Sequence, residues 1–134
     1  MQQPQRWDAL NFAWLTEPDN LQLEANGYQC EIKRVPSLLH LCGYVTVPTT
    51  HPCHAKHCDE VDVNVHGGLT YAKTDDYGTT FGFDCSHLGD LVPGMLRYAG
   101  GAAMALEYGD AYRDIAYVTA QINWLAQQLH DYKE

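Results

Sequence analysis

Hydrophobic and polar positions alternate along several stretches of the chain, which is the pattern of β-strands, because successive side chains of a strand point to opposite faces. Residues 28–35 and 38–47, separated by a Pro-Ser pair, predict a hairpin. The clearest alternation covers residues 61–72, where valines alternate with polar residues. Residues 80–85 predict a short aromatic strand that returns beside it, after an Asp- and Gly-rich turn at residues 73–79.

The last part of the chain has a helical period instead. Residues 110–131 predict an amphipathic helix with Asp110 capping its first turn. Its apolar positions recur at spacings of three and four: Ile115, Val118, Ile122, Leu125 and Leu129. We expect residues 1–27 to be irregular, and residues 95–109 fit either a loose helix or an irregular excursion. The whole pattern predicts one α+β domain spanning residues 1–134, an antiparallel sheet whose apolar face is covered by the C-terminal helix.

Length and composition are those of one folded domain. A chain of 134 residues with 46% apolar residues and nine tyrosines is not a disordered chain. Neither a signal peptide nor a membrane span is expected, which predicts a cytoplasmic protein. The cysteines are odd in number and lack a paired spacing, so we expect free thiols rather than disulfides at Cys30, Cys42, Cys53, Cys58 and Cys85.

The acidic charge bears on possible partners. Seventeen acidic residues against eight basic ones give a formal charge of −9, and the basic residues are scattered. Long nucleic acid is therefore not an expected partner, because binding to its phosphates needs a basic stripe. Single side chains such as Lys56 or Arg113 can still hold one phosphate. The commonest nucleotide, serine-hydrolase and zinc-protease motifs are absent from the sequence.

A loop at residues 51–58 is rich in side chains that zinc accepts as ligands, namely His51, Cys53, His54, His57 and Cys58. Structural zinc sites usually combine two ligand pairs from separate turns, and this chain has no distal cysteine pair to complete such a set. We therefore favour a histidine-rich loop without metal over a zinc site in this segment.

His66 ends the alternating valines and is followed by two glycines. Paired glycines weaken a strand unless a bulge or a close approach to the backbone requires them. A ligand lying against Gly67 and Gly68, with His66 as donor, acceptor or base, meets that requirement. A β-bulge with a hydrogen-bonded histidine meets it equally well.

A second polar group follows the returning strand at Asp84, His87 and Asp90. If the apolar faces of both strands pack on one core, Asp84 lies on the same side of the sheet as His66. These four side chains then form either a metal site or a set of donors and acceptors for a polar ligand. Ion pairing and loop capping are the plainer roles for the two aspartates. Cys85 points to the core by the same alternation, which disfavours it as a nucleophile.

Several short motifs resemble a family of small bacteriophage and prophage proteins of uncharacterised activity. The most specific are the segments HGGLTY at residues 66–71 and FDCSH at residues 83–87, and the resemblance extends over about residues 30–129. It implies a protein that acts in the cytosol of an infected bacterium. The family differs from this chain at Cys53, His57 and Cys58, which lowers the loop-zinc hypothesis. The matching polar positions are His51, Lys56, His66, Asp84, His87 and Asp90.

By analogy with small phage proteins that capture nucleotide-derived immune signals of the host, we expect a homo-oligomeric small-molecule binding protein rather than an enzyme. The expected ligand-binding residues are His66, Gly67, Gly68, Asp84, His87, Asp90 and Lys56. The first alternative is a hydrolase of phosphodiesters or nucleotides that depends on a divalent metal such as zinc, held by His66, His87, Asp84 and Asp90. The second alternative is an acidic inhibitor of a host defence protein.

Overall fold

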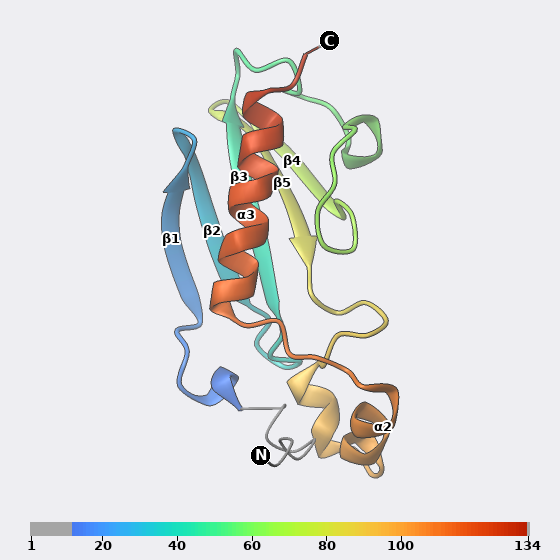
Figure 1. Cartoon of the computed structure of the whole chain (residues 1–134). Coiled ribbons are helices and arrows are strands. Elements are labelled where there is room, and N and C mark those ends of the chain that lie inside the picture. The colour runs from blue at the N-terminus through green and yellow to red at the C-terminus, as the bar shows by residue number, and fades with distance from the viewer. Residues whose placement is uncertain (1–11, 134) are drawn as a thin grey trace, which may run out of the picture.

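The computed structural model describes residues 12–133 and shows a five-stranded sheet with a long helix across one face (Figure 1). All neighbouring strands are antiparallel, in the order β1-β2-β3-β5-β4. The strands are β1 Asn20–Ala25, β2 Tyr28–Arg34, β3 Leu41–Pro48, β4 Tyr71–Asp75 and β5 Gly78–Asp84. Helix α3 (Ile115–His130) covers the sheet, and the short helix α2 (Gly101–Tyr108) lies beyond one end of it. The predicted α+β fold with a covering C-terminal helix is confirmed.

The face of the sheet that α3 covers is apolar, because the apolar residues of neighbouring strands lie opposite one another on that face. Val45 of β3 lies opposite Phe81 of β5, and Gly43 lies opposite Phe83. A Cβ on Gly43 would lie 2.6 Å from the Phe83 ring and 3.1 Å from Ile122 of α3. The missing side chain therefore lets the ring and the helix close over the centre of the sheet.

Helix α3 begins four residues later than a cap at Asp110 would predict. Its N-cap is Asp114, whose carboxylate accepts a hydrogen bond from the backbone N–H of Tyr117 at 2.8 Å. The backbone N–H of Asp110 instead donates to the carbonyl of Ala105 at the end of α2. The apolar stripe follows the predicted period, and its fully buried members are Val118, Ile122, Leu125 and Leu129.

Long-range contacts fix the segment just before α3. The hydroxyl of Tyr112 donates to Glu17 at 2.6 Å and accepts a hydrogen bond from the buried guanidinium of Arg34 at 2.7 Å. The next residue, Arg113, donates to Asp90 at 2.8 Å. These contacts hold the segment against β2 and the loop after β5, so the helix does not begin before them.

Residues 61–70 do not form the predicted strand. Their alternate valines still pack toward the core, which explains the sequence pattern. Two backbone N–H groups of the segment, however, donate to glutamine side chains of α3. The N–H of Asn64 donates to Gln128 at 2.7 Å, and the N–H of His66 donates to Gln121 at 2.8 Å. The segment therefore runs beside α3 as extended chain, and it meets the sheet at its end, where the N–H of Thr70 donates to the carbonyl of Gly82 in β5 at 2.9 Å.

Two other regions also differ from expectation. Residues 20–25, expected to be irregular, form β1, and residues 1–11 lie outside the described part of the chain. Asn26 and Gly27 connect β1 to β2 with positive φ angles of 51° and 82°, the conformation of a two-residue hairpin turn. Residues 95–109, which fit either a loose helix or an irregular excursion by sequence, mainly form helix α2. The 3-10 helix η3 (Pro93–Arg97) comes just before α2.

A second, smaller core holds α2 to the end of the sheet. Its buried members are Trp14, Leu91, Ala105 and Tyr112. Leu91 belongs to the loop after β5, so this core also fixes the segment that carries Asp90. No helix in residues 12–133 is long and apolar enough to cross a membrane.

Candidate functional site

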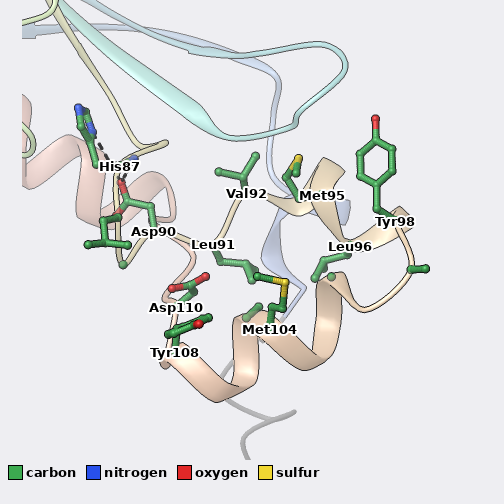
Figure 2. Close-up of a pocket in the computed structure, with 15 residues that line it drawn as sticks. His87, Asp90, Leu91, Val92, Met95, Leu96, Tyr98, Met104, Tyr108 and Asp110 are labelled. Carbon is green, nitrogen blue, oxygen red and sulfur yellow. Dashed lines mark hydrogen bonds and ion pairs between the residues drawn. The ribbon is translucent and has the colours of Figure 1, made fainter.

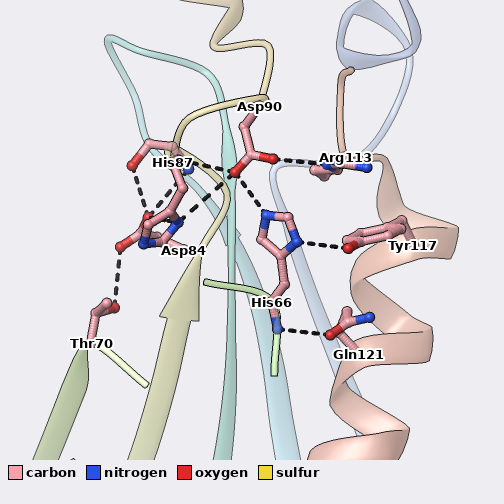
Figure 3. Close-up of polar contacts among 9 residues, drawn as sticks. His66, Thr70, Asp84, His87, Asp90, Arg113, Tyr117 and Gln121 are labelled. Carbon is pink, nitrogen blue, oxygen red and sulfur yellow. Dashed lines mark hydrogen bonds and ion pairs between the residues drawn. The ribbon is translucent and has the colours of Figure 1, made fainter. Parts of the chain in front are cut away.

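Asp90 is the centre of a polar cluster between the loop after β5 and helix α3 (Figure 3). Its side chain is 0% exposed. One oxygen accepts hydrogen bonds from Nε2 of His66 at 2.8 Å and from the backbone N–H of His87 at 3.0 Å, and the other accepts from Nε of Arg113 at 2.8 Å. Burial raises the pKa of Asp90, but these donors outweigh it and lower the pKa below its ordinary value. Asp90 is therefore held as a carboxylate.

His66 is oriented from both of its ring nitrogens. Because the Asp90 carboxylate only accepts, Nε2 of His66 carries a proton. In the neutral imidazole, Nδ1 then accepts from the hydroxyl of Tyr117, 2.6 Å away. The guanidinium of Arg113 lies 4.9 Å from the centre of the Tyr117 ring. Asp90, His66, Tyr117 and Arg113 thus form a closed ring of contacts in which the positive and negative charges compensate each other.

The two glycines after His66 form a tight turn, with the N–H of Gly68 donating to the carbonyl of Val65 at 2.8 Å. Both glycines have positive φ, 68° at Gly67 and 79° at Gly68. A Cβ on Gly67 would lie 2.3 Å from Cε1 of His87, so the imidazole of His87 lies against the Gly67 backbone. The close approach inferred from the sequence is therefore made by the protein's own histidine, and the segment is neither a β-bulge nor a bare surface at Gly67.

His87 and Asp84 complete the cluster. Nδ1 of His87 is 3.3 Å from an oxygen of Asp84 and 3.9 Å from one of Asp90, yet this buried nitrogen has no hydrogen-bond partner among residues 12–133. Asp84 accepts from the hydroxyls of Ser86 at 2.8 Å and Thr70 at 3.1 Å. Burial raises the pKa of Asp84, and the Ser86 hydrogen bonds and the other partners bring it below its ordinary value.

The structure brings four predicted residues together, but not in the predicted way. His66, Asp84, His87 and Asp90 meet where β5 ends. Asp84 pairs with Cys42, next to the buried pair of Gly43 and Phe83, so it faces away from α3. His66 instead contacts α3. The two residues do not share a sheet face, because His66 is not in a strand.

Lys56 does not join this cluster. Its ammonium lies 5.4 Å from the ring centre of Tyr132, beyond the C-terminal end of α3. The cluster contacts Tyr117 and Gln121 near the other end of that helix. Tyr117 and the end of α3 at His130 are thirteen residues apart, roughly 20 Å at about 1.5 Å per residue, and Tyr132 lies beyond that end. Lys56 and His66 therefore cannot hold the same small ligand.

The histidine-rich loop does not assemble a metal site. Cys53 is fully buried, and its backbone N–H donates to Nδ1 of His51 at 2.9 Å. The other ring nitrogen of His51 is 2.7 Å from the carbonyl of Leu129, and Nδ1 of His54 is 3.1 Å from the hydroxyl of Thr79. Within residues 12–133, a group of three ligand atoms within 4.8 Å of one another occurs at His66, His87 and Asp90 and not in this loop.

Cys85 is 1% exposed, and burial raises the pKa of its thiol well above the ordinary value. A thiol in this state is a poor nucleophile because the reactive species is the thiolate. The sequence-based interpretation of Cys85 as an inert core residue agrees with this environment.

A cavity of about 400 Å³ adjoins the cluster (Figure 2). His87, Asp90 and Asp110 form its polar part. The remaining walls come from the loop after β5, from η3 and from α2, and their larger side chains are Leu88, Leu91, Val92, Met95, Leu96, Tyr98, Met104 and Tyr108. Sequence analysis did not find this cavity, because its walls come from the segment without a clear period.

Sequence analysis also missed three polar residues of the site. Tyr117 and Gln121 are four positions apart on α3 and therefore lie on one side of the helix, facing His66. That spacing was visible in the sequence, but the partner was not. His40 is buried beside the cluster, and burial lowers its pKa, although the charges of Asp84 and Asp90 act to raise it.

The fold and the site define an α+β protein in which a buried ionic cluster meets an apolar cavity. Comparison of the chain with family models, with curated proteins and with solved structures finds no match.

Proposed function

We propose that the protein binds a small molecule in the cavity between the Asp90 loop, η3 and α2. The observation that carries this proposal is the junction of the cavity with the polar cluster at His87 and Asp90. A volume of about 400 Å³ lies within the range of roughly 300–1,000 Å³ that is usual for ligand sites. Such sites combine mostly apolar walls with a few polar groups that orient the ligand, and this cavity has both.

The lining indicates the chemistry of the ligand. Its aromatic, aliphatic and thioether side chains suit a molecule with a flat or aliphatic body. The polar end offers His87 and Asp110, and no lysine or arginine is among the residues that line the cavity. Arg113, the nearest cation of the cluster, is already paired with Asp90. A ligand that is neutral or cationic at its polar end is therefore favoured over a phosphate group.

This chemistry narrows the range of nucleotide-derived ligands that the sequence led us to expect. A nucleobase or nucleoside fits the cavity, whereas phosphates would extend out of it. Binding is favoured over turnover, because Cys85 is buried and the partners of Asp90 already occupy both of its oxygens. In the setting that the phage resemblance implies, the protein would act by capturing a small molecule of the infected cell.

An NMR titration of the full-length protein tests this function. Free nucleobases, nucleosides and aromatic amines are added singly, and amide shifts are followed. We expect shifts concentrated in residues 87–110 for the compounds that bind. Ala99→Trp fills the exposed rim of the cavity and should abolish these shifts, whereas Ala103→Trp, an exposed position of α2 outside the lining, should leave them unchanged.

Two results would overturn the proposal. One is the absence of any response in residues 87–110 to every compound, together with native mass spectra that show no co-purified molecule. The other is unchanged binding in the Ala99→Trp protein, which would place the ligand elsewhere.

A further inference from the structure

We propose that His66, His87 and Asp90 form a binding site for a divalent transition-metal ion, with zinc as the best match. One atom from each residue, two imidazole nitrogens and one carboxylate oxygen, lies within 4.8 Å of the others. Zinc in catalytic sites is commonly held by three such ligands. This inference goes beyond the binding of a small molecule and does not depend on which ligand enters the cavity.

Two of the three distances between ligand atoms require only small side-chain adjustments, and the third, between the two imidazoles, is within 4.8 Å. Ligand atoms around a tetrahedral zinc are about 3.3 Å apart when each bond is about 2.0–2.1 Å. Nε2 of His66 is 2.8 Å from the Asp90 oxygen, so this pair must open by roughly 0.5 Å. Nδ1 of His87 is 3.9 Å from the same oxygen, so this pair must close by roughly 0.6 Å.

Nδ1 of His87 provides an independent indication. Buried polar atoms are almost always hydrogen-bonded, yet this nitrogen has no such partner in the structure. It lies near the carboxylates of Asp84 and Asp90, where a cation is favoured. The imidazole is held in this place because Gly67 has no Cβ, which would collide with the ring.

The contacts behind the ligands are those that metal-binding histidines and carboxylates usually have. When a metal binds Nε2 of His66, the neutral ring takes its other tautomer: one proton leaves Nε2, and one is taken up from solvent at Nδ1. Nδ1 then donates to the oxygen of Tyr117, 2.6 Å away, which fixes the ring. The second oxygen of Asp90 stays bonded to Arg113.

Three protein ligands leave a further coordination position on the metal. Asp84, water, or a molecule in the cavity lined by His87 and Asp90 can occupy it. A bound metal would thus join the cluster to the cavity. It is also what the alternative of a metal-dependent hydrolase requires, although the present proposal concerns metal binding only.

The test is titration of metal-stripped, full-length protein with Zn²⁺ by calorimetry and with Co²⁺ by absorption spectroscopy. We expect one ion per chain. His87→Ala should weaken binding by at least about tenfold. This variant is the main one because the His87 side chain is 36% exposed and its buried Nδ1 has no hydrogen-bond partner within residues 12–133, so we expect the fold to persist. The matched control, His130→Ala, removes a histidine that is 59% exposed and should bind as the unaltered protein does.

Three results would overturn the metal site. The first is no saturable binding of either ion, and the second is unchanged affinity in the His87→Ala protein. The third is a thiolate-to-cobalt charge-transfer band, which would place the ion on a cysteine such as Cys58. The Ala99→Trp protein separates the two proposals, because it should lose small-molecule binding but keep the metal.

Discussion

The contact between Gly67 and the His87 imidazole allows a matched pair of substitutions to test the geometry of the site. Both glycines of the turn have a positive φ, so alanine is strained at either position. Only at Gly67 does a new Cβ meet another group, the His87 ring at 2.3–2.8 Å, because nothing lies within 4 Å of the Cβ position at Gly68. The difference between the two alanine variants therefore measures the contact with His87.

The expected loss of stability in each variant follows from two contributions, the backbone strain of alanine at positive φ and the contact with the His87 ring. A left-handed backbone conformation costs an L-residue about 1–2 kcal/mol of stability. Replacing glycine by alanine also lowers the conformational entropy of the unfolded chain, which offsets part of this cost. Gly68→Ala should therefore lower the free energy of unfolding by about 1 kcal/mol. Gly67→Ala bears the same cost and must also displace the imidazole, which adds roughly 1–3 kcal/mol if it behaves as an overpacked site.

Urea unfolding followed by tryptophan fluorescence measures both variants, and the double variant Gly67→Ala/His87→Ala completes a cycle. Removing the imidazole should reduce the cost of Gly67→Ala to that of Gly68→Ala, a coupling of roughly 1–3 kcal/mol. Equal stabilities of the two single variants, or a coupling near zero, would refute the packing of His87 on Gly67.

Three further predictions concern the charges around the site and the helix that borders it. Asp90→Asn should lower the free energy of unfolding by about 1.5–3 kcal/mol in urea melts, because it removes charge-assisted hydrogen bonds to a buried carboxylate. Asp114→Ala should cost about 1 kcal/mol in the same assay through loss of the α3 cap. Burial lowers the pKa of His40 below 6.5, and the charge of His87 acts in the same direction, whereas the charges of Asp84 and Asp90 oppose it. Just below pH 6.5 the unfolded chain therefore binds more protons than the folded protein does. Stability should therefore fall as the pH decreases from 7 toward 5, more steeply than in His40→Leu, and parallel slopes would contradict this.

The sequence predicted the sheet where alternation and strand pairing coincide. The hairpin of β2 and β3 and the inward faces of Phe81 and Phe83 follow from a core on one side of the sheet. Residues 61–70 have the same alternation without being a strand. The side chains of Gln121 and Gln128 instead form hydrogen bonds with the backbone of this segment. Alternation shows that one side of a segment is buried, but it does not show what pairs with the backbone.

The start of α3 and the full composition of the site depend on contacts that no local pattern records. Asp110 and Asp114 both precede the periodic run, and only the attachment of Tyr112 and Arg113 to distant residues decides which aspartate caps the helix. The expected packing of two alternating strands on one core indicated His66 and the FDCSH segment as one site. Tyr117 joined it only because α3 places that hydroxyl beside the imidazole.

The cluster around Asp90 is larger than a structural role requires. Apolar side chains of similar volume often hold two elements together as well as a buried ionic group does, because they avoid the cost of removing charges from water. A purely structural cluster would also have no need for a buried imidazole nitrogen without a partner, or for a cavity at its edge. Both features occur at His87, which is the one side chain shared by the proposed metal site, the cavity wall and the Gly67 contact. His87→Ala should therefore impair metal and small-molecule binding while changing the stability of the fold less than Asp90→Asn does.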